Sequence, residues 1–222
     1  MERGPRSRVG TRRTKSQGAS MDTPIILIGP LGVGKTTIAE LLAQRLGTVH
    51  YELDDRRWEY YGEIGYDHDH AVQLGEKEGF PAVLKYWKPF EVHAVERILA
   101  DCKDGVISFG AGHSVYEDEA LFERAQRALA PYNNVILLLP CEDVDQAAAI
   151  LNERFIRQMM EEGITPHAEE LEIREHFIRH PSNRRLAKRV VYTEGKSPEE
   201  TCEEIVHIVR DSTAGRDRLI IP

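Results

Sequence analysis

The chain has 222 residues, of which 41% are apolar and 30% are charged, a balance that is ordinary for one folded α/β domain with a small inserted lid. Its apolar runs stay short of the roughly 18 residues that a membrane-spanning helix needs. The formal net charge of −8 argues against extended nucleic-acid binding, because phosphate backbones require a basic surface. Three widely spaced cysteines predict no disulfide framework and no zinc site, which favours a cytoplasmic protein.

The start of the chain differs in charge from the remainder. Residues 1–20 carry six Arg or Lys and one acid, so they contribute +5 and leave −8 − 5 = −13 on the rest. Their low apolar content predicts a disordered basic extension, with Met21 as a possible working start and an organellar transit peptide as the alternative. Residues 21–210 are expected to form the folded domain, and residues 211–222 a flexible tail.

Five segments along the body of the chain have the apolar character of buried strands. They are residues 25–28, 49–53, 106–109, 134–139 and 190–192. Segments with helical spacing of apolar residues alternate with them, at residues 35–46, 80–103, 120–130, 143–160, 168–179 and 198–209. This alternation predicts a five-stranded parallel sheet covered on both faces, an α/β sandwich of three layers. Because ligands of such sheets bind at the carboxyl ends of the strands, the segments that follow the strands are the candidate sites.

The segment after the first strand has the phosphate-binding pattern G-x-x-x-x-G-K-T, and a helix begins directly behind it. Glycines allow backbone N–H groups to approach phosphate oxygens, and the helix N-terminus adds partial positive charge. We expect Lys35 to neutralise phosphate charge and the Thr36 hydroxyl to ligate Mg²⁺. The residues expected to hold ATP are Gly29, Pro30, Leu31, Gly32, Val33, Gly34, Lys35, Thr36 and Thr37. A chance match in a glycine-rich turn is the alternative, and the flanking strand and helix argue against it.

Two carboxylates follow the second strand. Glu52 and Asp54 are separated by one residue, so alternation along a strand end places them on the same side. One carboxylate near bound phosphates can hold a water on Mg²⁺, and a second can accept a proton from an attacking hydroxyl. The alternative is a pair of solvated acids that cap the next helix. Their position shortly after a phosphate-binding loop favours the functional interpretation.

Glycines also follow the third strand, in the segment Gly110-Ala111-Gly112-His113. They allow a ligand to approach the backbone closely, although a tight turn explains them equally well. His113 is a candidate to touch an acceptor, with a capping role as the alternative. The third strand does not end in the aspartate that is common there, so the carboxylate beside Mg²⁺ is expected from the acids after the second strand.

Three stretches of the chain together resemble the shikimate kinase family. The first, residues 26–54, contains the phosphate loop and the two spaced acids. The second, residues 104–112, is similar to the family's strand that leads into a substrate-binding glycine loop, and the third, residues 179–187, to the stretch between lid and last strand. The resemblance spans most of residues 24–210 and implies a P-loop kinase fold that uses ATP and Mg²⁺.

The resemblance implies roles for individual residues. Asp54 would hold the acceptor hydroxyl and act as the base, and Glu52 would stand near Mg²⁺. The segment 110–113 would line the acceptor pocket, although the family's middle glycine is an alanine here, and Arg179 would contact an acceptor carboxylate. Lys88 stands where the family has an arginine that clamps this carboxylate. A lysine offers a point charge in place of a planar fork, so bidentate recognition is not expected.

The lid is expected around residues 152–176, without the family's lid motif Arg-Pro-Leu-Leu. Arg154 and Arg157 share a helix face and are the nearest candidates to neutralise charge on the transferred phosphoryl group. A solvated helix face explains each of them equally well. Arg184 is a candidate for stacking on adenine, with a plain surface position as the alternative.

Residues 62–80 are longer than the corresponding segment of the family. Within them, residues 66–70 hold several potential metal ligands without a further partner at ligand spacing, so a solvated loop or a lip over the acceptor site is expected. The aromatic side chains of Trp58, Tyr60 and Tyr61 are expected in the core, with lining of the acceptor pocket as the alternative.

Together these observations predict an ATP-dependent kinase that transfers the γ-phosphoryl group to a hydroxyl of a small metabolite, with an acceptor site altered from that of shikimate kinase. One alternative is a kinase for a nucleoside or nucleotide, a sugar acid or an antibiotic; an acceptor phosphate would require several arginines, and residues 55–100 offer three. The other is an ATP-binding switch or degenerate binding module, against which Lys35, Glu52 and Asp54 argue. The acceptor and the choice between monomer and dimer stay open.

Overall fold

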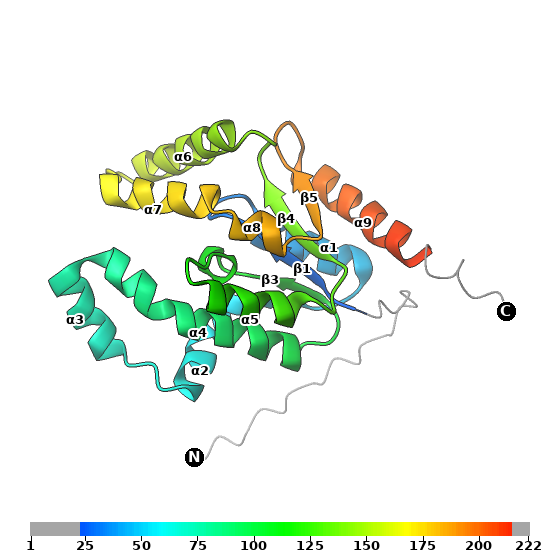
Figure 1. Ribbon diagram of the computed structural model, residues 1–222. Helices are drawn as coiled ribbons and strands as arrows, with labels where there is room; N and C mark the ends of the chain where they lie inside the picture. The colour runs from blue at the N-terminus through cyan, green and yellow to red at the C-terminus, as the bar shows by residue number, and fades with distance from the viewer. Residues whose placement is uncertain (1–22, 215–222) are drawn as a thin grey trace, which may run out of the picture.

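The structure, a computed structural model, describes residues 23–214 and contains a five-stranded sheet flanked by helices (Figure 1). In spatial order the strands are β2 (His50–Glu52), β3 (Val106–Ser108), β1 (Ile25–Ile28), β4 (Val135–Leu139) and β5 (Arg189–Tyr192). Every neighbouring pair is parallel, which confirms the predicted fold class. The predicted basic extension and the last residues of the predicted tail lie outside the described residues.

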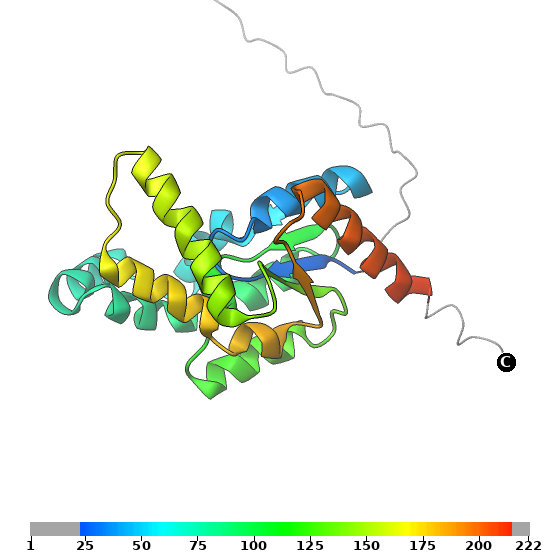
Figure 2. The ribbon, with the colours of Figure 1, turned by 90° about the horizontal axis from the view of Figure 1, so that it is seen from above.

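Side chains of the strands alternate between two apolar layers. Ile25 and Leu27 point to the layer that contains α1 (Lys35–Leu46) and α9 (Pro198–Ala214). Ile26 and Ile28 point to the opposite layer, which contains α4 (Phe80–Asp101) and α5 (Glu119–Leu129). Figure 2 shows the sheet between these helix layers. Because both faces are buried, β1 and β4 are apolar at every position.

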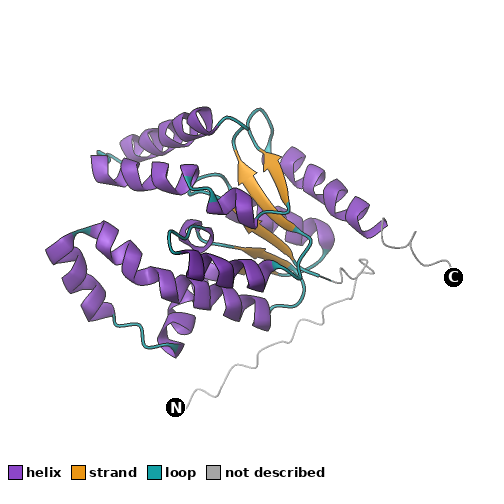
Figure 3. Cartoon of the chain, viewed as in Figure 1, coloured by secondary structure: helices purple, strands orange, loops and turns teal. Residues whose placement is uncertain are grey.

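The predicted lid corresponds to two long helices that pack against each other, α6 (Val144–Glu161) and α7 (Ala168–Arg179). The break between them contains the Gly-Ile-Thr-Pro segment, residues 163–166. A short helix that the sequence did not predict, α8 (Ser182–Leu186), leads from α7 back to β5. Figure 3 shows how far helix exceeds strand around the small central sheet.

The segment between β2 and β3 differs from the expectation in two ways. The second strand was expected to reach residue 53, but helix α2 (Leu53–Glu63) begins there, so Asp54 lies in its first turn, where the helix dipole favours a carboxylate. Residues 66–70 were expected as a loop or lip, but Asp67 caps α3 (His68–Glu78) by accepting a hydrogen bond of 3.0 Å from the backbone N–H of His70. Helix α3 then packs on α4.

The glycine segment after β3, the last helix and the aromatic residues of α2 were also predicted from the sequence. The glycine segment after β3 forms a single 3₁₀ turn, η1 (Ala111–Ser114), and α9 continues to Ala214, four residues into the predicted tail. Tyr60 and Tyr61 are core residues, as expected, whereas the Trp58 side chain is 45% exposed. Within the described residues, no helix has both the length and the apolar character of a membrane span.

Candidate active site

The phosphate loop connects β1 to the N-terminus of α1. Gly29 has a φ of +141°, and a Cβ atom there would lie 2.6 Å from the carbonyl oxygen of Leu138 on β4, so only glycine fits. Gly32 and Gly34 also have positive φ values, of +81° and +95°, which let successive N–H groups turn to one side. The loop therefore forms an anion cradle at a helix N-terminus.

Lys35, the first residue of α1, is buried beneath this loop. Its ammonium donates hydrogen bonds to the carbonyl oxygens of Gly29 at 2.8 Å and Pro30 at 2.9 Å. Burial lowers the pKa of Lys35 to about 8, and the negative charges of Asp54 and Glu52 partly offset that effect. A buried ammonium held by carbonyl oxygens alone gains most from an anion, so Lys35 is placed to receive phosphate charge.

The lowered pKa of Lys35 leads to a prediction about pH. Nucleotide phosphates favour the ammonium form, so above pH 8 binding of ATP requires uptake of a proton by Lys35. We expect the affinity for ATP to be flat below pH 8 and to weaken by up to about tenfold per pH unit above it. Calorimetry at pH 9 in two buffers of different ionisation enthalpy measures the proton uptake directly. Equal heats in both buffers at pH 9 would contradict this assignment.

Thr36 and Glu52 lie together although β2 and α1 are separate elements. The Thr36 hydroxyl donates a hydrogen bond of 3.0 Å to Oε1 of Glu52, the last residue of β2. A hydroxyl and a carboxylate oxygen beside a phosphate cradle are the kind of donor set that Mg²⁺ accepts, with water filling its other positions. These two predicted metal residues are therefore brought together, and their chemistry fits the ion.

Asp54 is held against the segment after β3. A Cβ atom at Gly110 would overlap the Asp54 carboxylate, lying 2.7 Å from its Cγ, so the glycine makes the space that the carboxylate occupies. Arg57, one turn along α2, donates a hydrogen bond of 3.4 Å to Oδ1 of Asp54. The carboxylate is thus positioned beside the predicted acceptor loop, although it comes from a helix and not from a strand end.

His113 in η1 is buried beside Asp54, with 2% of its surface exposed. Burial lowers its pKa to about 4, so the imidazole is neutral at pH 7. Its Nε2 lies 3.5 Å from the hydroxyl of Tyr61, while its Nδ1 has no hydrogen-bond partner and lies 3.9 Å from Oδ1 of Asp54. A neutral ring with an unused nitrogen is suited to a hydroxyl group of a ligand.

One cavity of about 510 Å³ connects the phosphate loop to these residues. Most of its lining residues come from α7 and from α2, α4 and η1, and Figure 1 shows how α7 and α4 are arranged. Its polar lining includes Asp54, Arg57, Glu91, Gly112, His113, Glu169, Glu170 and Arg174. Its apolar lining is Leu31, Phe80, Leu84, Trp87, Ala111, Ile173 and Phe177. The cavity size suits a small metabolite together with the terminal phosphate of a nucleotide.

Lys88 lies beside this cavity, but its ammonium is already paired with a carboxylate of the protein. It is 5% exposed, and its ammonium forms an ion pair of 2.8 Å with Glu91, which is also buried. A second N–H donates to the carbonyl oxygen of Gly112 at 3.3 Å, and the ammonium lies 5.3 Å from the ring centre of Phe177. A Cβ atom at Gly112 would lie 3.0 Å from Cδ of Glu91, so this glycine admits the ion pair.

The structure does not bring the other predicted arginines to the cavity. Arg179 at the end of α7 is ion-paired with Asp145 on α6 and with Glu175, and it is absent from the cavity lining. Arg154 pairs with Glu194 at 2.6 Å, and Arg157 pairs with Glu153 at 3.3 Å; the side chains of both arginines are exposed. Arg184 donates to the carbonyl oxygen of Glu142 at 2.9 Å. Each is already bound to another residue of the protein.

Two arginines that were not predicted as site residues line the cavity. Arg57 follows Asp54 by three residues on one helix face, so helical spacing could have revealed it. Its guanidinium also lies 4.4 Å from the ring centre of Trp58. Arg174 reaches the phosphate loop from α7, with Nη2 donating to the carbonyl oxygen of Leu31 at 3.4 Å. That contact joins residues 143 apart in sequence, so no local pattern could have revealed it.

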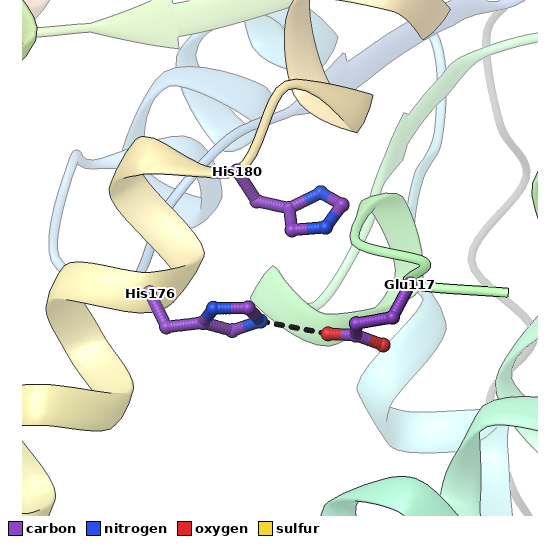
Figure 4. A group of neighbouring side chains, drawn as sticks. All are labelled: Glu117, His176 and His180. Atoms are coloured by element: carbon purple, nitrogen blue, oxygen red, sulfur yellow. Dashed lines mark hydrogen bonds and ion pairs between the residues drawn. The ribbon is translucent and has the colours of Figure 1, made fainter.

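A cluster of Glu117, His176 and His180 lies outside this cavity (Figure 4). Nε2 of His176 lies 2.7 Å from Oε1 of Glu117, and Nδ1 of His180 accepts a hydrogen bond of 3.2 Å from the N–H of Ser182. A neutral His180 therefore carries its proton on Nε2 and has no free lone pair for a metal ion. The cluster ties α7 to the turn before α5 by hydrogen bonds.

The fold and the site together define a class of protein. A five-stranded parallel sheet of order β2-β3-β1-β4-β5, a phosphate loop after β1 and a carboxylate across one cavity from that loop are the features of a P-loop phosphotransferase. The sequence model of the shikimate kinase family matches residues 31–210. The chain belongs to the shikimate kinase family.

Similar proteins agree with this assignment. A shikimate kinase of Streptomyces avermitilis is 29% identical over 82% of this chain and 92% of its own length. The solved structure of shikimate kinase from Acinetobacter baumannii in complex with shikimate has a TM-score of 0.53 at 19% identity, covering 86% of this chain and 94% of that chain. The solved structure of a gluconokinase from Sinorhizobium meliloti has a TM-score of 0.56 at 13% identity, covering 90% of this chain and 98% of that chain.

Membership of this family establishes the general activity. The chain is an ATP-dependent phosphotransferase that acts on an alcohol group of a small hydroxylated metabolite. Membership of the family does not identify the specific acceptor.

Proposed function

We propose that this chain binds Mg²⁺·ATP on the loop formed by residues 29–36 and transfers the γ-phosphoryl group to a hydroxyl held by Asp54. The observation that carries the proposal is that Leu31 of the phosphate loop and Asp54 line the same cavity. In-line transfer requires the leaving and attacking oxygens on opposite sides of one phosphorus atom. A cavity between the loop and the carboxylate supports that arrangement.

The proposed roles follow from the contacts of each side chain. Lys35 neutralises phosphate charge from beneath the loop, and Asp54 accepts the proton of the acceptor hydroxyl. Thr36 and Glu52 hold Mg²⁺, which when bound would neutralise and orient the terminal phosphates. Closure of α6 and α7, the lid around residues 152–176, excludes water and limits hydrolysis of ATP.

The acceptor that the cavity supports best carries no carboxylate. Lys88 is committed to Glu91 and to the carbonyl oxygen of Gly112, so its ammonium has little capacity left for a ligand anion. Arg179, the other expected carboxylate contact, is paired with Asp145. Of the two arginines that line the cavity, Arg57 donates to Asp54 and Arg174 donates to the phosphate loop. The non-reacting part of the acceptor therefore meets apolar and aromatic side chains, together with the neutral ring of His113. We therefore propose an uncharged hydroxylated compound with an apolar face.

The test is release of ADP from Mg²⁺·ATP in the presence of a panel of acceptors. The panel contains shikimate, gluconate, nucleosides, uncharged cyclic polyols and aromatic alcohols. We expect the greatest stimulation from a polyol or an aromatic alcohol without a carboxylate. The matched comparison is shikimate against the alcohol in which a hydroxymethyl group replaces its carboxylate, because the two differ only at the group that the cavity is proposed to disfavour.

The outcomes separate the parts of the proposal. Preference for shikimate over its hydroxymethyl analogue would overturn the uncharged acceptor while leaving the kinase in place. Stimulation by a nucleoside or by gluconate would move the acceptor to those classes. Tight binding of ATP without stimulation by any compound would favour an ATP-binding switch or binding module over a metabolite kinase.

A further inference from the structure

We propose that Arg174, on the lid helix α7, is the residue that contacts the γ-phosphoryl group of bound ATP and stabilises its charge during transfer. The inference rests on the proposed function, because it takes the phosphate loop as the ATP site. It replaces Arg154 and Arg157, which sequence alone favoured for this role.

The first observation is the environment of the guanidinium. Arg174 is 5% exposed and is the buried arginine of the described residues. Its Cζ lies 3.9 Å from the ring centre of Phe155 on α6, and its Nε is buried without a hydrogen-bond partner. Within residues 23–211 no carboxylate forms an ion pair with it. Burial lowers the pKa of Arg174, and the charge of Glu170 one turn earlier only partly opposes that effect.

A buried charge without a counter-ion is costly, and proteins retain one where a ligand supplies the opposite charge. The direction in which Arg174 points identifies that ligand. Nη2 donates to the carbonyl oxygen of Leu31 at 3.4 Å and lies 3.3 Å from the position of a Cβ atom at Gly32. The guanidinium therefore lies over the loop that is built to hold phosphates, on the same cavity as Asp54.

The position between loop and carboxylate distinguishes the γ-phosphoryl group from the other phosphates. Lys35 reaches the loop from beneath, through the carbonyl oxygens of Gly29 and Pro30, whereas Arg174 reaches it from α7 on the cavity side. The transferred group is the one that faces the acceptor, so a cation on the cavity side meets it. A planar guanidinium can bind two of its oxygens at once.

Arg154 and Arg157 lack these properties. The side chain of Arg154 is 42% exposed and that of Arg157 is 63% exposed, and each has a carboxylate partner. Exposed and paired arginines gain less from a new anion than a buried and unpaired one. Arg157 is therefore the alternative γ-phosphoryl contact against which Arg174 is tested.

The experiment is calorimetric titration of the full chain with Mg²⁺ and either ADP or the non-hydrolysable analogue AMP-PNP. For Arg174→Met we expect AMP-PNP to bind about 10- to 100-fold more weakly, the effect of losing one or two charge-assisted hydrogen bonds, with ADP within about twofold of the parent. Arg174→Lys keeps the charge but lacks the planar guanidinium, so its affinity for AMP-PNP should lie between those of Arg174→Met and the parent. The matched control is Arg127→Met, which removes an exposed arginine on α5 and should leave the affinities for ADP and AMP-PNP unchanged.

The control for folding is the melting temperature of the nucleotide-free variants. Methionine keeps the packing on Phe155 and removes an uncompensated charge, so Arg174→Met should melt no lower than the parent. Equal weakening of ADP and AMP-PNP, or weakening of AMP-PNP by Arg157→Met and not by Arg174→Met, would overturn the proposal. Should Arg174→Met fail to fold, the ratio of AMP-PNP to ADP affinity in Arg174→Lys decides in the same way.

Binding of these two nucleotides needs no acceptor, so the result is independent of the proposed kinase reaction. Lack of turnover with every acceptor, combined with selective loss of AMP-PNP binding in Arg174→Met, would count against the kinase proposal and support Arg174 as the γ-phosphoryl contact. Normal turnover in Arg174→Met would count against Arg174 alone.

Discussion

Replacing Asp54 with asparagine is expected to lower kcat by ~10²–10⁴-fold, the range for loss of a positioned general base. Asparagine keeps the size of the side chain in the first turn of α2 but cannot take the proton of the acceptor hydroxyl. Asp54 lies against Gly110 and forms no hydrogen bond with the phosphate loop within the described residues, so the Kd of ATP should change by less than about threefold. Turnover and direct ATP binding are measured at pH 7, where Lys35 remains protonated.

Two further variants make the Asp54 result specific. Asp55→Asn changes the exposed acid next to it and should leave kcat unchanged. Gly110→Ala alters no reacting group, but its methyl would overlap the Asp54 carboxylate, so it should reduce kcat by displacing the base. Equal losses of kcat and ATP affinity in Asp54→Asn would remove the base assignment, and full activity in Gly110→Ala would show that the position of Asp54 is not critical.

The fold could be predicted because its signals are local and redundant. Apolar runs such as Ile25–Ile28 and Val135–Leu139 are typical of strands buried on both faces, and helices with apolar spacing separate them. Leu53 was predicted to end a strand but begins helix α2, and this boundary could not be predicted in the same way. It arises where a three-residue strand ends directly in a helix whose first turn holds two acids, and propensity does not locate such a boundary.

The candidate site divides between residues whose role depends on local sequence and residues whose partners are distant. The phosphate loop, Thr36, Glu52 and Asp54 lie within residues 29–54, and the structure brings them together. Arg179 was expected at the acceptor because residues 179–187 resemble the shikimate kinase family, but Asp145, 34 residues earlier, binds it. Arg174 becomes a site residue only through the packing of α7 over Leu31. An ion pair in the first case and a hydrogen bond in the second join residues far apart in sequence, and no spacing rule encodes such contacts.

The Lys35→Met variant is expected to lose phosphoryl transfer almost completely, by ~10³-fold or more in kcat/KM, because the preorganised cation beneath the phosphates is removed. Methionine matches the length and packing of the lysine stem. The control is Lys188→Met, which removes an exposed lysine just before β5 and should leave kcat/KM unchanged. Retention of full activity in Lys35→Met would refute the assignment of this loop as the phosphate site.

The same variant carries a stability argument that separates loss of function from loss of fold. Burial lowers the pKa of Lys35 from 10.5 to about 8, so at pH 7 the folded state bears a cost of roughly 3 kcal/mol for keeping this ammonium charged. The cost is fully present below pH 8 and is relieved as pH rises from 8 to 10.5, because the folded state releases its proton first. Without nucleotide, Lys35→Met should therefore be at least as stable as the parent at pH 7, with the difference shrinking towards pH 10. Unfolding in denaturant at both pH values measures this, and a variant that is inactive and also less stable at pH 7 would show that Lys35 supports the fold and that its loss of activity reports on folding.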